Sequence, residues 1–263
     1  MAGNFSISTN IRSSPLLLRI LVSSLLIPIA FSEDSDLLNK ICANTTGNYT
    51  HGGAFAKNMK SLLDVLYDQT STNHGFRFAT RGEGRDSVYG LALCRGDVSS
   101  DDCADCIYDA RCKITRRCYG REAVVWYDYC YLKYSGRGFF GKIDHGNDFV
   151  LVNVEDVAES EKKKFREAVI GLLVTVSKTA SEKAQLFSGG EELLGGEKNT
   201  TIYTMAQCSG DLSSHSCYEC LGGAVKELPI YEGKGYSVGG RVVGTSCNVR
   251  YEIYSFLKPK ATT

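Results

Sequence analysis

The chain has 263 residues, and its 30 lysines and arginines balance 30 aspartates and glutamates, so the formal net charge is zero. A neutral chain lacks the basic surface that attracts nucleic acid or a strongly anionic membrane, and we expect neither as a partner. The length suits two small domains, and 11 cysteines are many for a chain kept in a reducing compartment.

The N-terminus has the layout of a cleavable leader. Arg12 and Arg19 precede an uncharged run, residues 20–31, which is shorter than the stretch of about 18 apolar residues that spans a bilayer. An acidic stretch follows Ser32 at once. This layout predicts a signal peptide over residues 1–32, with a buried N-terminal helix as the alternative. Cysteines tend to pair in the oxidising compartments that a secreted chain reaches.

After the leader, the pattern predicts two helices and then strands. Apolar residues with the 3.6-residue period predict an amphipathic helix: Phe55, Met59, Leu62, Leu63 and Leu66. A second helix is expected to start near Ser100, with its counterpart near Ser214, because Ser and Asp can cap free backbone N–H groups there. Its inward face in the first copy would hold Cys103, Cys106, Ile107, Ala110 and Ile114. Aromatic and β-branched residues then predict strands over residues 123–126 and 130–134.

The second half of the chain repeats this order. Residues 94–106 have the spacing C-x8-C-x2-C, and residues 208–220 have it again. The helix stripe also recurs, at Phe165, Val169, Leu172, Leu173 and Val176. Strands are expected over residues 241–245 and 247–256.

This repeat predicts an α+β chain of two tandem domains, each an antiparallel β-sheet with two helices packed on one face and stapled by disulfides. The expected boundaries are a signal peptide over 1–32, a first domain over 33–138, a linker over 139–148 and a second domain over 149–258. No apolar segment follows residues 254–259, so we expect no membrane span and no lipid anchor. In a secreted chain the Asn-X-Ser/Thr sequons at Asn44, Asn48 and Asn199 are candidate glycosylation sites.

The cysteine motif and the strand segments 123–130 and 247–252 resemble the ginkbilobin-homologous, stress-antifungal domain of land plants. In that family the domain occurs in tandem in cysteine-rich repeat secretory proteins, plasmodesmata-located proteins and cysteine-rich receptor-like kinases. The resemblance covers nearly the whole mature chain. Because neither a membrane span nor a kinase domain follows, the chain looks like a secretory member of the family.

The resemblance implies a disulfide connectivity, whereas spacing alone leaves fifteen pairings of six cysteines open. The implied pairs are Cys42–Cys118, Cys94–Cys103 and Cys106–Cys130 in the first copy, and Cys208–Cys217 and Cys220–Cys247 in the second. Val152 and residues 230–231 stand where the second copy lacks the first and fifth cysteines. The missing bridge is worth roughly 4 kcal/mol in the chain-entropy model, so we expect the second copy to depend on docking against the first for its stability.

Cys112 is left over by this pairing. It is either a tolerated free thiol or the site of an intermolecular disulfide, because an odd cysteine in an oxidising compartment invites one. Its position off the apolar face of its helix keeps both interpretations open.

Catalytic and metal-binding patterns are weak. The four histidines lie in separate polar segments without ligand spacing: His51, His74, His145 and His215. The cysteines lack the two neighbouring pairs of a structural zinc site. No nucleophile elbow or phosphate loop is present, and no pair of carboxylates lies in an apolar neighbourhood that would separate their pKa values. We therefore expect neither an enzyme nor a cofactor.

One sugar site is implied by the resemblance. In the ginkbilobin-type lectin an Asn beside the first cysteine, an Arg before the last cysteine and a Glu after it contact mannose, which points to Asn153, Arg241 and Glu252 here. A hairpin turning near residues 246–247 would place Arg241 and Glu252 almost opposite one another, with positions 248, 250 and 252 on one face. The alternative is a cross-strand ion pair without a ligand. The first copy has Ala43, Val124 and Ser135 at these places, so only the second copy is expected to bind sugar.

The sequence thus predicts a secreted, non-enzymatic binding protein of the plant apoplast, which binds a mannose-type glycan in defence or antifungal activity. The alternative is an extracellular protein-interaction module that partners a receptor-like kinase or acts at plasmodesmata.

Overall fold

The computed structural model describes residues 37–195 and 199–259, apart from the side chains of residues 44–46. The signal peptide predicted for residues 1–32 lies outside these ranges. Within them, no helix combines the length and the apolar character needed to cross a bilayer.

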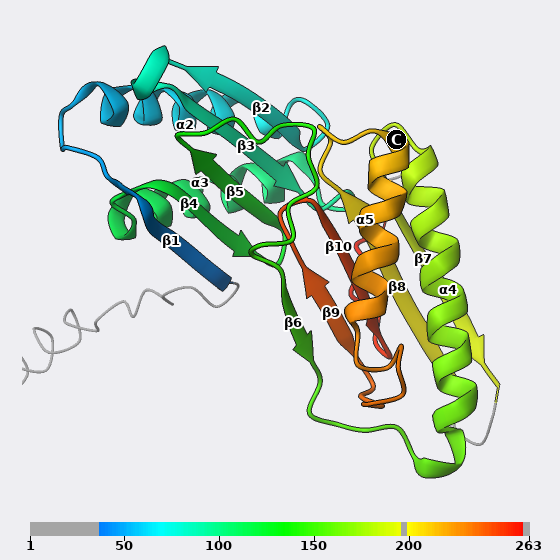
Figure 1. The fold of residues 1–263 in the computed structure, drawn as a ribbon. Helices are drawn as coiled ribbons and strands as arrows, with labels where there is room; N and C mark the ends of the chain where they lie inside the picture. Colours follow the sequence, from blue (N-terminus) through cyan, green and yellow to red (C-terminus); the bar gives the residue numbers. More distant parts are fainter. Residues whose placement is uncertain (1–36, 196–198, 260–263) are drawn as a thin grey trace, which may run out of the picture. The chain divides into compact units, whose positions relative to one another are not determined.

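Repeat one folds in the order strand, helix, two strands, helix, two strands (Figure 1). Its elements are β1 (Leu37–Asn48), α2 (Ala54–Thr70), β2 (Phe76–Arg81), the short 3-10 helix η2 (Gly84–Asp86), β3 (Val88–Cys94), α3 (Ser100–Arg117), β4 (Gly120–Tyr127) and β5 (Cys130–Ser135). The five strands form an antiparallel sheet in the order β1-β4-β5-β3-β2.

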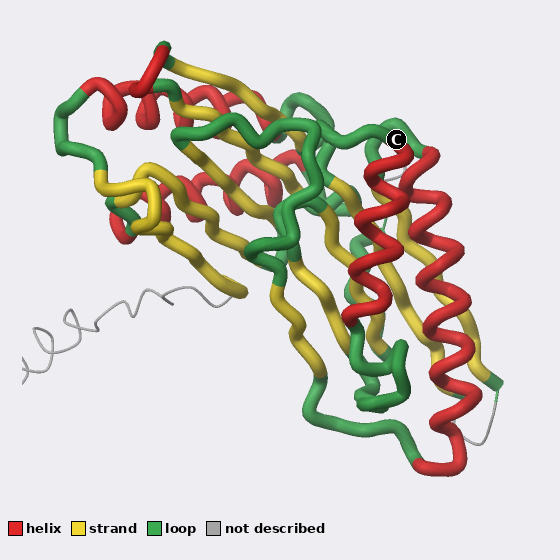
Figure 2. The backbone as a smooth tube through the Cα atoms, in the orientation of Figure 1, coloured by secondary structure: helices red, strands yellow, loops and turns green. Residues whose placement is uncertain are grey.

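Repeat two has the same order of elements and the same sheet topology. Its elements are β6 (Phe149–Val152), η3 (Glu159–Glu161), α4 (Lys162–Glu182), β7 (Phe187–Leu194), β8 (Thr200–Cys208), α5 (Ser214–Glu227), β9 (Gly240–Val243) and β10 (Cys247–Glu252). The antiparallel strand order is β6-β9-β10-β8-β7. In each repeat two helices cover one face of the sheet. Figure 1 shows this for α4 and α5, and in Figure 2 the same helices are the red coils that lie over the yellow strands. The predicted α+β fold of two tandem domains is confirmed.

Local sequence explains where the helices begin and which side they bury. Ser99 and Ser213 cap α3 and α5, because each hydroxyl accepts a hydrogen bond from the backbone N–H three residues later. The five predicted stripe residues of α2 are all buried between the helix and the sheet. In α4 the equivalent stripe is buried except for Leu172, which is partly exposed.

Each repeat therefore has its own core between sheet and helices, and a third apolar cluster lies on the faces that carry no helices. This third cluster joins Leu91, Leu93, Val124, Trp126 and Tyr131 of repeat one to Val243 of repeat two. Both repeats belong to a single compact unit. The third cluster is thus one place where the two repeats touch.

Five disulfides staple the repeats, and they are the pairs that the family resemblance implied: Cys42–Cys118, Cys94–Cys103, Cys106–Cys130, Cys208–Cys217 and Cys220–Cys247. Cys112 is free and partly exposed. In the first sheet Cys42 lies opposite Ala123, which is seven residues before Cys130. In the second sheet Val152 lies opposite Gly240, which is seven residues before Cys247. Val152 therefore occupies the place of the absent first cysteine.

The segment expected as a linker, residues 139–148, contains no helix or strand, yet it packs closely. Phe139 and Phe140 contact the third apolar cluster. The carboxylate of Asp144 lies 2.7 Å from Nζ of Lys133, a lysine that is almost fully buried. The segment thus fills part of the joint between the repeats.

Candidate functional site

The joint between the repeats is held by backbone hydrogen bonds as well as by apolar packing. Trp126 donates its indole N–H to the carbonyl of Gly244 at 3.2 Å, and the hydroxyl of Tyr131 donates to the carbonyl of Thr245 at 2.5 Å. From the other side, the amide of Gln207 donates to the carbonyl of Cys94 at 2.9 Å. Two large aromatic side chains of repeat one therefore hydrogen-bond to the β9–β10 turn of repeat two.

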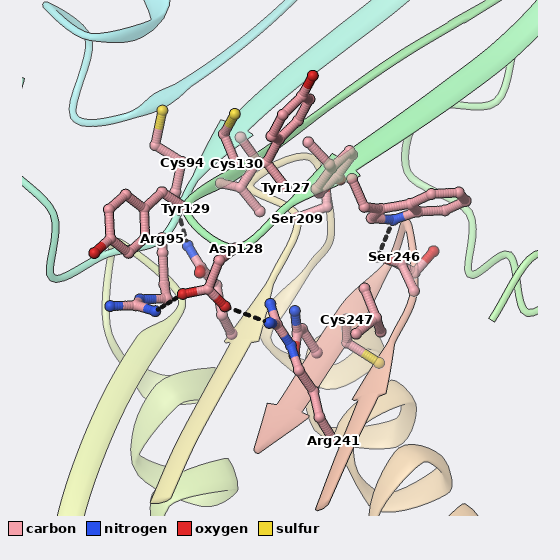
Figure 3. A pocket seen from close by; sticks show the side chains of 17 residues that line it. Cys94, Arg95, Tyr127, Asp128, Tyr129, Cys130, Ser209, Arg241, Ser246 and Cys247 are labelled. Carbon is pink, nitrogen blue, oxygen red and sulfur yellow. Dashed lines mark hydrogen bonds and ion pairs between the residues drawn. The ribbon is translucent and has the colours of Figure 1, made fainter. Parts of the chain in front are cut away.

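A cluster of charged side chains lies beside this contact (Figure 3). Asp128, on the β4–β5 turn of repeat one, accepts a bond from Nη1 of Arg241 at 2.6 Å. Oδ2 of Asp128 accepts a bond from Nη1 of Arg95 at 3.0 Å. Nη1 of Arg250 lies 3.3 Å from Oδ1, the same oxygen that Arg241 binds. One carboxylate of repeat one thus binds two arginines of repeat two and one of its own.

Two further carboxylates complete what we name the arginine cluster: Arg95, Arg241 and Arg250 with Asp97, Asp128 and Glu252. Asp97 lies 2.6 Å from Nε of Arg95, and Glu252 lies 3.1 Å from Nε of Arg250. The cluster contains equal numbers of positive and negative groups, so its charges can compensate one another at neutral pH.

The C-terminal segment covers the cluster. The guanidinium of Arg250 lies 4.3 Å from the ring centre of Phe256, and the carbonyl of Phe256 accepts from Arg95 at 3.0 Å. The backbone N–H of Lys258 donates to Asp97 at 2.7 Å. Residues at the end of repeat two therefore contact repeat one a second time.

Burial and ion pairing act against each other in the cluster. Burial lowers the pKa of Arg241 to about 10, an effect that Asp128 opposes. Burial would raise the pKa of Asp128, but Arg241, Arg250 and Arg95 outweigh it and leave that pKa below its ordinary value. Burial raises the pKa of Glu252, against the attraction of Arg250. The Arg241–Asp128 pair is thus ionised and firmly held at neutral pH.

The space left at the joint is small. The cavity lined by Arg95, Asp128 and Arg241 measures about 30 Å³, which is room for one or two water molecules. A sugar ring does not fit there while the repeats are docked.

The three residues predicted to contact a sugar lie on one face, the helix-free face of the repeat-two sheet. Asn153 follows β6 opposite Gly239, and its N–H donates to the Gly239 carbonyl at 2.9 Å. The carboxylate of Glu252 lies directly over Gly239, where a Cβ would come within 1.9 Å of Oε2. Arg241 is two residues further along β9. The structure thus brings the three positions together.

The expected hairpin register was wrong by one residue at the turn. Arg241 lies opposite Arg250, not opposite Glu252, because Val243 pairs with Asn248 and the turn is at residues 245–246. The N–H of Gly244 donates to the carbonyl of Cys247 and closes this turn. The expected alternation does hold within β10, where Val249 and Tyr251 enter the core and Arg250 and Glu252 point to the other face.

Three more potential ligands converge elsewhere, although their sequence positions gave no sign of it. Nδ1 of His145 lies 2.7 Å from Oδ2 of Asp148, and Glu227 at the end of α5 completes a group whose ligand atoms lie within 4.8 Å of one another. Burial raises the pKa of Asp148. The His145 contact opposes this, and the charges of Glu227 and Asp144 add a smaller upward effect. This is the one such group in the ranges that the structure describes.

With fold and site in view, comparisons with known proteins assign the chain to a class. A model of the stress-antifungal family, described as salt stress response/antifungal, matches residues 41–137 and again residues 153–254. The chain belongs to this family and carries its domain twice, which confirms the resemblance seen in the sequence.

Individual relatives agree with this assignment. Cysteine-rich repeat secretory protein 38 of Arabidopsis thaliana is 40% identical over 248 residues, which are 92% of this chain and 94% of that protein. The antimicrobial ginkbilobin-2-like protein of Castanea crenata is 41% identical over 212 residues, 80% of this chain and 85% of that protein. The crystal structure of the tandem DUF26 ectodomain from the Arabidopsis thaliana cysteine-rich receptor-like protein PDLP8 has the same fold, with a TM-score of 0.68, 24% identity, and coverage of 82% of this chain and 98% of that one.

Proposed function

We propose that this chain is a secreted, extracellular binding protein of plant defence that recognises a protein partner and performs no catalysis. Family membership and the printed names of the relatives, secretory and antimicrobial, support this proposal. Five disulfides suit an oxidising compartment such as the apoplast. The sequon residues Asn48 and Asn199 are both exposed, as glycosylation requires.

The observation that carries the proposal is the free edge of the repeat-two sheet. β6 pairs with β9 on one side, and no other strand of the described chain lies on its outer side. Val150, Leu151 and Val152 are 40%, 40% and 50% exposed, and Val154 just beyond is 98% exposed. An exposed apolar edge strand is a template on which a partner can add an extended segment. The ectodomain of a receptor-like kinase, or a plasmodesmal protein, is the class of partner that we propose.

Substitution at the edge tests this proposal. The double variant Val152→Glu, Val154→Glu places charge on the edge, and we expect it to weaken capture of an extracellular plant protein by about tenfold or more. Val174→Glu, at a valine 48% exposed on α4, is the matched control. Binding of proteins from apoplastic washing fluid to the immobilised chain, followed by mass spectrometry and titration of the captured protein, measures the effect. Equal capture by the edge variant and the control would refute the proposal.

A mannose-type glycan is the second candidate, and one observation favours it. Asn153, Arg241 and Glu252 share a face, and Oε2 of Glu252 is buried without a hydrogen-bond partner in the described chain. The difficulty is that Arg241 is only 6% exposed and already bound to Asp128. Calorimetric titration of mannose into the wild type and Arg241→Ala tests this candidate, and Asp128→Asn, which frees Arg241, should strengthen binding. Absence of heat in both the wild type and Asp128→Asn would exclude the sugar site.

A further inference from the structure

The seam between α2 and α3 in repeat one is hollow. It encloses about 400 Å³, within the range of about 300–1,000 Å³ that small-molecule sites occupy. The side chains of Tyr49, Met59 and Leu63 line it and are almost fully buried, so they give it an apolar floor. Cys112 and Thr115 line it from α3. The groove therefore offers apolar contact area to a ligand chain of several carbons.

The rim of this groove is positively charged. Lys57 and Lys60 lie one turn apart on α2, both are exposed, and neither has an ion pair within the described part of the chain. Arg111, on the opposite side, is bound to Asp64 and so is largely compensated. Two uncompensated ammonium groups at the edge of an apolar floor favour an anionic ligand head.

The start of α2 adds to this charge. Its N-cap is Gly53, which has no side chain to accept from the first backbone N–H groups, and the first turn contains no acidic residue. The free N–H groups of such a turn, with the helix dipole, favour a negative charge. Gly52 and Ala56 of this segment line the groove, so the uncapped turn and the two lysines border the same space.

A second groove lies along the helix pair of repeat two, further along the helices and with a different charge pattern. It lies between α4 and α5, encloses about 570 Å³ and has both Glu219 and Lys226 on its lining. Glu159 and Glu161 lie just before the first turn of α4. The lining of this groove thus carries both signs of charge, and Lys226 offers a control position within the same chain.

We propose that the α2–α3 groove of repeat one binds an aliphatic carboxylate, with the carboxylate between Lys57, Lys60 and the first turn of α2 and the hydrocarbon chain on the floor formed by Met59 and Leu63. The inference is independent of the protein partner proposed above, because that partner docks on the edge of the other repeat. Burial of the chain supplies the affinity, and the cations select the charged head.

Decanoate is the probe, used below its micelle concentration. Cys112, the one free cysteine in the described chain, lines the groove and serves as a reporter. We expect calorimetry to show one decanoate per chain, and bound decanoate to slow modification of Cys112 by a thiol reagent about tenfold at saturation. Decanamide, which has the same chain but no charge, should bind about tenfold more weakly.

The variants separate this site from a general effect of charge. Lys57→Glu combined with Lys60→Glu should weaken decanoate binding about tenfold or more, whereas Lys226→Glu in the repeat-two groove should leave it unchanged. Circular dichroism and thermal unfolding show whether each variant is folded. The proposal is overturned if decanoate does not protect Cys112, if decanamide binds as tightly, or if Lys226→Glu has the same effect as the double variant.

Discussion

The two repeats have the same topology, but their first strands differ: one is held by a disulfide and the other is not. In repeat one a disulfide ties β1 at Cys42 to the end of α3 at Cys118. In repeat two the equivalent strand, β6, carries an exposed Val152 at that place and has no bridge. Both strands lie at a sheet edge, but only the repeat-two edge lacks the crosslink that restrains its counterpart, and it carries exposed valines. Repeat two contacts repeat one through Trp126, Tyr131 and the arginine cluster, and we expect these contacts to stabilise it in place of the bridge.

The largest expected effect comes from making repeat one like repeat two. Replacement of Cys42 and Cys118 by serine should lower the free energy of unfolding by about 4 kcal/mol, because the bridge closes a long loop in the unfolded chain. Denaturant unfolding under oxidising conditions measures this loss. Cys112→Ser, which removes a free thiol and no bridge, is the control. If the double variant unfolds with unchanged free energy, the Cys42–Cys118 bridge does not make repeat one more stable than repeat two.

A smaller loss is expected at the joint. Trp126→Ala removes a side chain that is 1% exposed and donates to Gly244 of repeat two, and should cost about 3 kcal/mol. Hydrogen exchange should rise in repeat two, because we expect that repeat to depend on docking against repeat one for its stability. Leu62→Ala, in the separate core of repeat one, should also destabilise the chain but leave exchange in repeat two nearly unchanged. Similar exchange patterns in the two variants would contradict the dependence of repeat two on the joint.

The smallest effect concerns the charge at the joint and is revealed by pH. Asp128→Asn should lower stability by about 1 kcal/mol at neutral pH, a modest value because the Asp128 carboxylate is 29% exposed. Folding lowers the pKa of Asp128, so its contribution is complete above the ordinary pKa of 3.8 and disappears as the pH falls through the folded-state pKa. The difference in free energy of unfolding between wild type and variant should therefore be constant from pH 7 to pH 5 and should begin to shrink below about pH 4.

Unfolding curves at a series of pH values measure that difference. Glu159→Gln, which breaks a pair with Lys162 at a carboxylate 87% exposed, is the control and should change little at any pH. A stability difference that does not shrink at all as the pH falls below 3.8 would mean that Asp128 acts through packing and not through its charge.

Features internal to one repeat could be predicted from the sequence, because they follow from local periodicity or from the family pattern. The stripes of α2 and α4, the caps near Ser100 and Ser214, and the alternation along β10 are of this kind. The turn between β9 and β10 was misplaced because a tight turn moves the register by whole residues. Cys247 belongs to β10, where it lies opposite Cys208, and so cannot form part of the turn.

The environment of Arg241 could not be predicted, because its partner belongs to the other repeat. Asp128 is 113 positions away and lies on a turn whose sequence shows no periodic pattern. The same applies to His145 and Glu227, which approach only because the segment after repeat one passes the end of α5. Residues from different repeats meet through the docking of two surfaces, and no spacing within the chain encodes that contact.

The C-terminal segment makes the end of the chain part of the joint. Arg95 of repeat one donates to the carbonyl of Phe256, and Asp97 of repeat one accepts from the backbone N–H of Lys258. These two bonds hold the end of repeat two against repeat one. Lys258 therefore lies beside the charged contact between the repeats, near the end of the described chain. Pulling force or bulk applied there acts directly on that contact, whereas the same load on an exposed loop would have to pass through a folded domain first.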